Sequence, residues 1–117
     1  MMQTNSKYRN KKVTVNGRRF DSKKESKRHY ELFMLERAGE ISALEAQKKF
    51  RLLDSQRDEN GKCIEKKIDY LADFYYIDKT GKPVVEDTKS PATKKLPSYI
   101  IKRKLMLFFH GIRIVEV

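Results

Sequence analysis

The sequence predicts an α/β fold, more narrowly an α+β domain, on three observations. Its 117 residues are the length of one ordinary domain. Hydrophobic residues make up 38% of the chain and charged residues 37%, enough for one modest core between two thin layers. Strand and helix patterns follow one another in the order hairpin, helix, three strands, helix, strand.

The N-terminal third is expected to contain a basic arm, a hairpin and a helix. Residues 1–10 are predicted to form a flexible basic arm, and residues 11–117 a single domain. Asn16-Gly17 lies between two strand-like runs, which is a strong hairpin signal. Ser22 to Glu25 has the spacing of a capping box, and Gly39 ends the helix. The buried stripe of this helix is predicted from the spacing of its apolar residues, Tyr30, Phe33, Met34, Ala38 and Ile41.

Strand patterns and turn residues predict the remaining elements. Three strands are expected at residues 42–53, 66–77 and 83–89, the first despite its helix-friendly Ala-Leu-Glu-Ala. A turn-rich connection at residues 54–62 joins the first two, and residues 78–81 make a tight turn. Pro97 suits the first turn of a second helix, which Gly111 caps, and residues 112–117 form a closing strand.

The net charge of +11 and the sequence pI near 9.8 indicate a polyanionic partner: DNA, RNA or an anionic membrane. No apolar run approaches the roughly 18 residues of a membrane-spanning helix. The N-terminus also lacks the apolar stretch of a signal peptide. We therefore expect a cytoplasmic protein with no membrane partner.

The charges are unevenly distributed. Residues 1–28 hold ten Lys or Arg against two acids, and residues 89–104 hold six Lys or Arg and no acid. Between these segments, residues 69–87 hold five acids against two lysines. Metal binding would explain an acidic cluster inside a basic protein, and a solvated strand face is the alternative.

Cysteine and histidine are too few for a zinc finger or a histidine-rich nuclease motif. Cys63 is the only cysteine, and His29 and His110 are the only histidines, so four zinc ligands of these types are not available. A bound metal must therefore be held by oxygen ligands, which favours Mg²⁺ or Mn²⁺.

The segment that carries chemistry runs from Asp73 through a hairpin to Asp87 and Lys89. Side chains alternate along a strand, so Asp87 and Lys89 project to the same face. A hairpin can bring Asp73 beside them, and the peptide carbonyl of Thr88 can add a third oxygen ligand. Lys89 would then orient the attacking water or neutralise charge that develops on a phosphate.

This pattern resembles the PD-(D/E)XK nuclease superfamily, which includes many restriction enzymes and Holliday junction resolvases. The chain is most similar to a family of small phage and prophage proteins. It shares four stretches with them, Phe20–Glu25, Tyr70–Phe74, Val84–Ser90 and Tyr99–Leu105, within a likeness that spans residues 7–117. The resemblance implies a restriction-endonuclease-like core in which helices flank a mixed central sheet.

The resemblance also implies roles for individual residues. Asp73 and Asp87 would be metal ligands, Lys89 the catalytic lysine and Glu25 an acidic residue supplied by the first helix. Gln47 falls where some relatives place a polar active-site residue. Ala72 replaces the superfamily's proline, a departure that many members share. The resemblance further implies a homodimer, branched DNA as substrate, and expression in the cytoplasm of a bacterial host.

Each candidate has a simpler interpretation. Asp73 would be an exposed strand residue, and Asp87 and Lys89 a surface ion pair contributing only about 0–1 kcal/mol. Glu25 is a natural member of a capping box with Ser22, and is available to a metal only if Asp21 is the cap instead. Phosphate contacts are predicted for basic residues near both ends of the chain, with a solvated surface as the alternative: Lys11, Lys12, Arg18, Arg19, Arg28, Lys94, Lys95, Lys102, Arg103 and Lys104.

Two functional hypotheses follow. The first is a Mg²⁺- or Mn²⁺-dependent DNA endonuclease that recognises branched structure and not base sequence, because one small domain has little room for groove readout. The second is a non-catalytic DNA- or RNA-binding accessory protein of a phage or prophage. Basic patches suit both hypotheses, whereas carboxylates inside strands favour the first.

Overall fold

A computed structural model describes residues 13–15, 18–20 and 22–117, with side chains from Ser22 onward. The predicted arm, the Asn16-Gly17 turn, Lys11 and Lys12 lie outside the described residues. The N-terminal elements are β1 (Val13–Val15), β2 (Arg18–Phe20), α1 (Lys23–Arg37) and β3 (Ser42–Leu53). The elements that follow are β4 (Gln56–Arg57), β5 (Cys63–Glu65), β6 (Ile68–Ile77), β7 (Pro83–Asp87), α2 (Pro91–Lys94), α3 (Pro97–His110) and β8 (Val115–Glu116).

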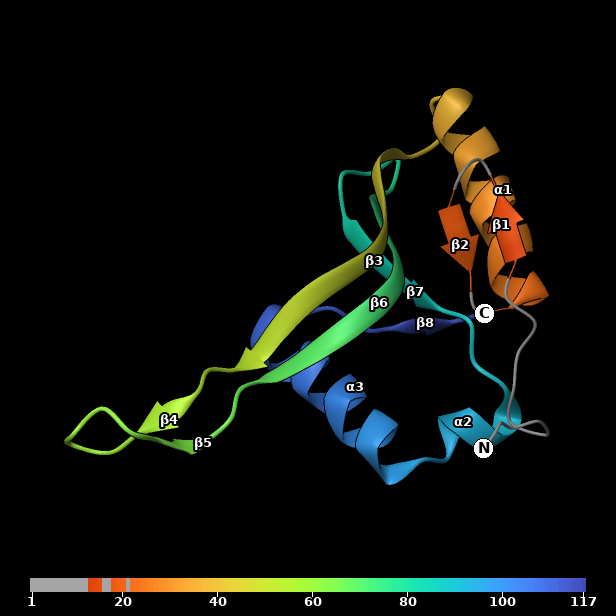
Figure 1. The fold of residues 1–117 in the computed structure, drawn as a ribbon. Coiled ribbons are helices and arrows are strands. Elements are labelled where there is room, and N and C mark those ends of the chain that lie inside the picture. Colours follow the sequence, from red (N-terminus) through yellow and green to blue (C-terminus); the bar gives the residue numbers. More distant parts are fainter. Residues whose placement is uncertain (1–12, 16–17, 21) are drawn as a thin grey trace.

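The central sheet is mixed, and helices flank it, as predicted (Figure 1). Its strand order is β3-β6-β7-β8. The β3–β6 and β6–β7 pairs are antiparallel, and β7 pairs with β8 in parallel. The parallel pair requires a crossover connection, which α2 and α3 provide. The α+β class is therefore confirmed.

Several predicted segments differ in detail. The strand predicted at residues 83–89 ends at Asp87, so Lys89 lies beyond β7, and the strand predicted at residues 112–117 is confined to Val115–Glu116. The connection at residues 54–62 is not simply a turn, because β4 and β5 pair into a two-stranded ribbon that projects from the sheet (Figure 1). Between β7 and α3 lies a short helix that was not expected, α2, whose Thr93 amide donates to the Ser90 hydroxyl. Both elements are short and mostly exposed, so they lack the hydrophobic periodicity from which the longer elements were predicted.

The ends of the helices are formed by the residues that the sequence indicates. Ser22 caps α1 by accepting a hydrogen bond from the Glu25 amide. Pro97 occupies the first turn of α3, and Gly111 ends this helix with φ of 67°, a left-handed conformation that favours glycine. In the described residues, no helix combines the length and apolar character needed to cross a membrane.

The predicted buried stripe of α1 is largely wrong. Tyr30 and Met34 are 55% and 45% exposed, whereas Glu25, His29 and Leu32 are buried. The buried face carries polar residues because it contacts polar groups of the sheet, described below. A periodicity judged on apolar residues alone therefore selects the wrong face of this helix.

The core has two clusters, one against each long helix. Tyr70 and Ala72 belong to the cluster that includes residues of α3, while Phe74 and Tyr76 belong to the cluster that includes a residue of α1. Tyr75, an odd-numbered residue of β6, packs against the α3 cluster together with the even-numbered Tyr70 and Ala72, so the regular alternation of β6 changes near Asp73. The change of partner falls at Asp73, between the two clusters.

Candidate functional site

Strand register places the two predicted carboxylates opposite each other. In the antiparallel β6–β7 pair, Phe74 is opposite Glu86, so the next position along brings Asp73 opposite Asp87. In the parallel β7–β8 pair, Asp87 is the partner of Glu116. Three acidic residues from three adjacent strands therefore form one row across the sheet.

Asp87 is a fully buried carboxylate. Its Oδ1 accepts a hydrogen bond of 3.0 Å from the Asp73 backbone N–H, and its Oδ2 accepts one from the Tyr70 hydroxyl. Burial, together with the nearby charge of Asp73, raises the pKa of Asp87 to about 6. The Tyr70 hydrogen bond and the ammonium of Lys89 oppose this rise but do not overcome it.

The Asp73 carboxylate is oriented by Thr88, the residue that follows β7. Asp73 Oδ2 accepts hydrogen bonds from the Thr88 backbone N–H at 2.8 Å and from the Thr88 hydroxyl at 2.7 Å. Asp73 is half-buried, so it is closer to solvent than Asp87. Its side chain is therefore held in one orientation at the open side of the pair.

Lys89 completes the predicted group. Its Nζ lies 3.5 Å from Asp87 Oδ2 and 4.8 Å from the centroid of the Tyr99 ring. The Tyr99 hydroxyl in turn donates to Glu116 Oε2 at 2.6 Å. A cation over an aromatic face is attracted by the ring, and this one also has a carboxylate beside it. Asp73, Asp87 and Lys89, predicted together from the sequence, are thus brought together.

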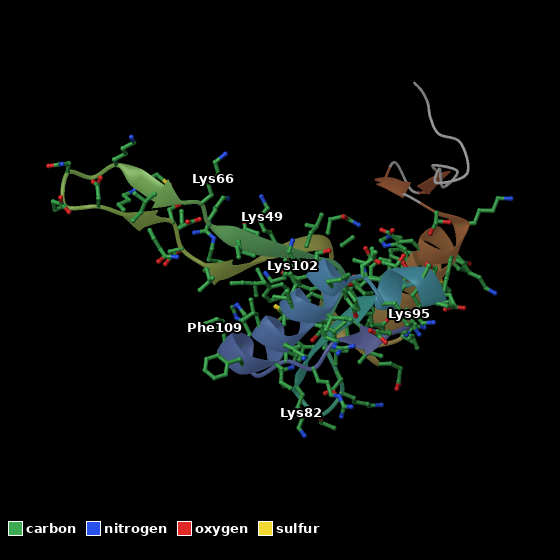
Figure 2. The ribbon with its side chains drawn as sticks, turned by 90° about the horizontal axis from the view of Figure 1, so that it is seen from below. Lys49, Lys66, Lys82, Lys95, Lys102 and Phe109 are labelled. Carbon is green, nitrogen blue, oxygen red and sulfur yellow. The ribbon has the colours of Figure 1, made fainter. Side chains whose placement is uncertain are left out.

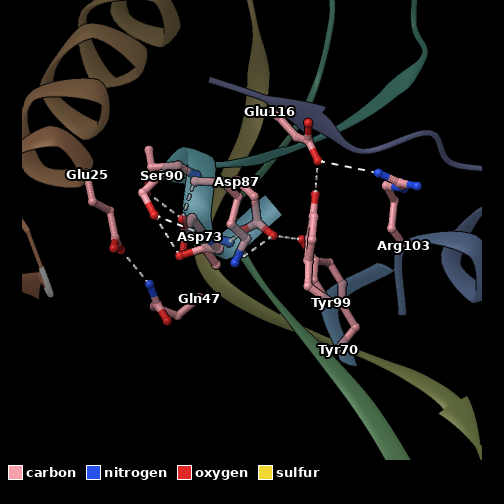
Figure 3. A network of polar contacts seen from close by, with 12 residues as sticks. Glu25, Gln47, Tyr70, Asp73, Asp87, Ser90, Tyr99, Arg103 and Glu116 are labelled. Carbon is pink, nitrogen blue, oxygen red and sulfur yellow. Dashed lines mark hydrogen bonds and ion pairs between the residues drawn. The ribbon is translucent and has the colours of Figure 1, made fainter. Parts of the chain in front are cut away.

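Gln47 is located in β3 directly opposite Asp73, because the residues on either side of the two are register partners. Its φ of 57° is rare for a residue with a side chain, and such strain is often found at functional sites. Its amide Nε2 donates to Glu25 Oε2 at 2.6 Å (Figure 3). Gln47 therefore connects the row of acidic residues on the sheet to Glu25 of α1.

Glu25 is buried beside Gln47. Its backbone N–H donates to the Ser22 hydroxyl that caps α1, and its carboxylate accepts a hydrogen bond from the Gln47 side-chain amide. Within the described residues, no three His, Cys, Asp or Glu side chains gather in the way that a protein-only metal cage requires. Glu25 thus does not form a three-acid group with Asp73 and Asp87. The predicted cap residue, Ser22, is confirmed.

Arg28 has a structural partner. Its Nε and Nη2 donate to the two carboxylate oxygens of Glu86 at 2.7 and 2.8 Å, and the Tyr76 hydroxyl donates to the same carboxylate. Glu86 is only 1% exposed and forms an ion pair with Arg28, so its role is structural. This hydrogen bonding raises the pKa of Arg28 and gives it a function other than the predicted phosphate contact.

The donor set fits a hard divalent cation bound in part by substrate. Mg²⁺ is commonly held by one or two carboxylates, with water and phosphate oxygens filling the other positions. Asp73 and Asp87 supply two carboxylates from rigid strands. Asp87 Oδ1 accepts one hydrogen bond and keeps a second lone pair, and both hydrogen bonds from Thr88 go to the Oδ2 of Asp73. The Thr88 backbone, the predicted third ligand, adjoins the pair.

The other predicted phosphate contacts lie around α2 and α3. Lys94 and Arg103 are each 3.9 Å from Glu116, and Figure 2 labels Lys95 and Lys102 beside these helices. Lys104 is exposed on α3. Arg18 and Arg19 belong to β2, where the described structure is confined to the backbone.

Sequence reasoning missed the residues that support the pair. The sequence patterns assign no role in the site to Tyr70, Tyr99 or Glu116. Their contacts join residues 17 positions apart in each case, Tyr70 to Asp87 and Tyr99 to Glu116. Strand register could have linked Asp87 to Glu116, had the parallel pairing been known.

The fold and site define an α+β domain with facing carboxylates and a lysine on a mixed sheet. The family model described as "Protein of unknown function (DUF1064)" matches residues 5–114, so the chain belongs to that family. No curated protein matches the chain, and no solved structure does.

Proposed function

We propose that the protein is a Mg²⁺- or Mn²⁺-dependent endonuclease that hydrolyses phosphodiester bonds in DNA. The observation that carries the proposal is the facing pair of Asp73 and Asp87, with Lys89 Nζ 3.5 Å from the buried carboxylate. Phosphodiester hydrolysis needs a polarised phosphate, an activated water and neutralisation of developing charge. The net charge of +11 suits a polyanionic substrate.

The position of each residue suggests which of these three tasks it would perform. Asp73 is half-buried and oriented by Thr88, so it would be the more accessible of the two carboxylates to a substrate. Asp87 lies behind it, with Tyr70 as a donor from the core. A bound divalent cation would polarise the phosphate and lower the pKa of a coordinated water. Lys89, held between Asp87 and Tyr99, supplies positive charge or positions the water.

The sequence resemblance extends the proposal in three respects. It suggests branched DNA as the preferred substrate, a homodimer as the active form, and the cytoplasm of a bacterial host as the site of action. The small domain supports recognition of DNA shape over base sequence. Sedimentation velocity tests the dimer, and a monomer at working concentration would contradict it.

Cleavage assays test the catalytic proposal. We expect the wild type to nick supercoiled plasmid or cut a synthetic four-way junction with Mg²⁺ or Mn²⁺. Asp87→Asn and Lys89→Met should bind DNA but not cut it, since both substitutions keep the size of the side chain and remove its charge. Lys82→Gln, in the exposed β6–β7 turn, is the charge-matched control and should cut normally.

A non-catalytic nucleic-acid-binding protein is the second candidate, favoured by the lack of a three-acid metal group in the described residues. Measuring the melting temperature during a titration with Mg²⁺ distinguishes the nuclease from the non-catalytic binding protein. A cation that binds the folded state stabilises it by RT ln(1 + [L]/Kd), about 1.4 kcal/mol at roughly ten times Kd. A Mg²⁺-dependent rise in melting temperature in the wild type but not in Asp87→Asn supports the nuclease. DNA binding with neither cleavage nor this rise supports the second candidate.

A further inference from the structure

A second charged site lies next to the carboxylate row. A hollow of about 380 Å³ opens between α3 and β8. It is lined by three cationic residues, one carboxylate and two apolar side chains: Arg103, Lys104, Arg113, Glu116, Leu107 and Ile114. Arg113 precedes β8 and was not among the residues predicted to contact phosphate.

The charges of the hollow do not balance within the part of the chain that the structure describes. Glu116 accepts a hydrogen bond from Tyr99 and lies 3.9 Å from Arg103. Among the described residues, Lys104 and Arg113 have no acidic partner within 4.0 Å. Three positive charges therefore face one negative charge, which favours binding of an anion.

The position of the hollow relates it to the proposed catalytic pair. Glu116, which lines the hollow, is the strand partner of Asp87. Neighbouring strands are about 4.8 Å apart. Asp87 contacts Tyr70 and Glu116 contacts Tyr99, and both tyrosines belong to the core cluster at α3. The carboxylate row and the hollow thus occupy the same face of the sheet.

We propose that this hollow binds a backbone phosphate of the nucleic-acid strand whose adjacent segment lies over Asp73 and Asp87. The inference rests on the proposed function and identifies a second contact with the same substrate. Arg113 and Lys104 supply the free positive charge, while Leu107 and Ile114 provide an apolar wall against which a sugar can pack. Phosphate contacts of this kind set the register of a strand without reading its sequence.

Binding of a fluorescein-labelled oligonucleotide, measured by anisotropy in EDTA over a range of KCl concentrations, tests the proposal without cleavage. Arg113→Gln should weaken binding about tenfold, as expected for loss of one charge-assisted hydrogen bond. It should also reduce the salt slope by about 0.7–0.9, the value for one phosphate contact. Lys82→Gln changes the net charge equally, and Lys82 is an exposed residue of the β6–β7 turn that does not line the hollow, so the substitution should leave affinity near that of the wild type.

Arg113 is exposed, so Arg113→Gln should melt at the wild-type temperature, which excludes misfolding as the cause of weaker binding. Equal affinities for Arg113→Gln and Lys82→Gln would overturn the hollow as a strand site, while cleavage by the wild type would leave the nuclease proposal standing. Arg113-dependent binding of inorganic phosphate without any effect on oligonucleotide binding would also overturn it, in favour of a small-anion site. Arg113-dependent strand binding by a protein that never cuts would support the hollow and refute the catalytic proposal.

Discussion

Asp87→Asn should make the metal-free protein more stable at pH 7. The side chain of Asp87 is fully buried, and its pKa is raised from 3.8 to about 6. Between these two values the folded protein binds more protons than the unfolded chain, so the free energy of unfolding falls as pH rises through this window. At pH 7 the ionised carboxylate therefore reduces stability relative to its protonated form.

The size of the effect follows from the shift in pKa. A rise of about two units corresponds to about 3 kcal/mol at 1.36 kcal/mol per unit. Asparagine resembles the protonated acid, because its oxygen can accept from the Asp73 N–H while its amide donates to the Tyr70 oxygen. For a domain of this size, about 3 kcal/mol corresponds to a rise in melting temperature of roughly 10 °C.

Calorimetry in EDTA across pH 3 to 8 would measure this gain. The gain should be full above pH 6 and disappear below pH 4, where both forms of residue 87 are neutral. Glu86→Gln is a matched control, since Glu86 is an equally buried neighbour that pairs with Arg28, and its substitution should destabilise the protein. An Asp87→Asn variant less stable than the wild type at pH 7, or a gain that persists at pH 3, would refute the reasoning.

Three further predictions concern residues that support the site. Tyr70→Phe removes the hydroxyl donor to Asp87, so the pKa of Asp87 should rise further. Urea unfolding at pH 7 should show a loss of about 1–3 kcal/mol, and the loss should be smaller at pH 3, where the hydroxyl of the wild type bonds a neutral acid. Gln47→Gly should be more stable than Gln47→Ala by about 1 kcal/mol in thermal melts, because only glycine tolerates φ of 57° without strain; equal stabilities would contradict this. Tyr99→Leu should lower the cleavage rate more than Tyr99→Phe, because only phenylalanine keeps the ring over which Lys89 lies, and equal rates in a single-turnover assay would show that the ring does not matter.

Local signals predicted the parts of the fold that depend on adjacent residues. The bounds of β3, residues 42–53, match the predicted strand, and α3 begins at Pro97 and ends before Gly111 as expected. The facing of Asp73 and Asp87 followed from one hairpin, whose register a short turn determines. In each case the information lies within a few residues of the feature.

The parts that sequence did not predict depend on contacts between distant elements. The buried face of α1 is set by the sheet, where Gln47 meets Glu25 and Glu86 meets Arg28. Counting apolar residues cannot identify the buried face of α1, because two of the contacts on this face are made by the charged side chains of Glu25 and Arg28. Glu116 reaches the site through the parallel β7–β8 pair, whose two strands are separated in the sequence by α2 and α3.

The effect of the Asp87 charge on the stability of the folded protein is itself an argument that this residue has a function. The hydrogen bonds that Asp87 makes with Asp73 and Tyr70 are ones that a neutral asparagine could replace. Its negative charge lowers stability at neutral pH, and Lys89 does not overcome the rise in pKa caused by burial and Asp73. A buried charge that reduces stability without a structural need is expected where activity requires it. A cation held by Asp73 and Asp87 would offset the buried charge and the repulsion from Asp73, the two causes that raise this pKa, and the proposed phosphodiester hydrolysis requires such a cation.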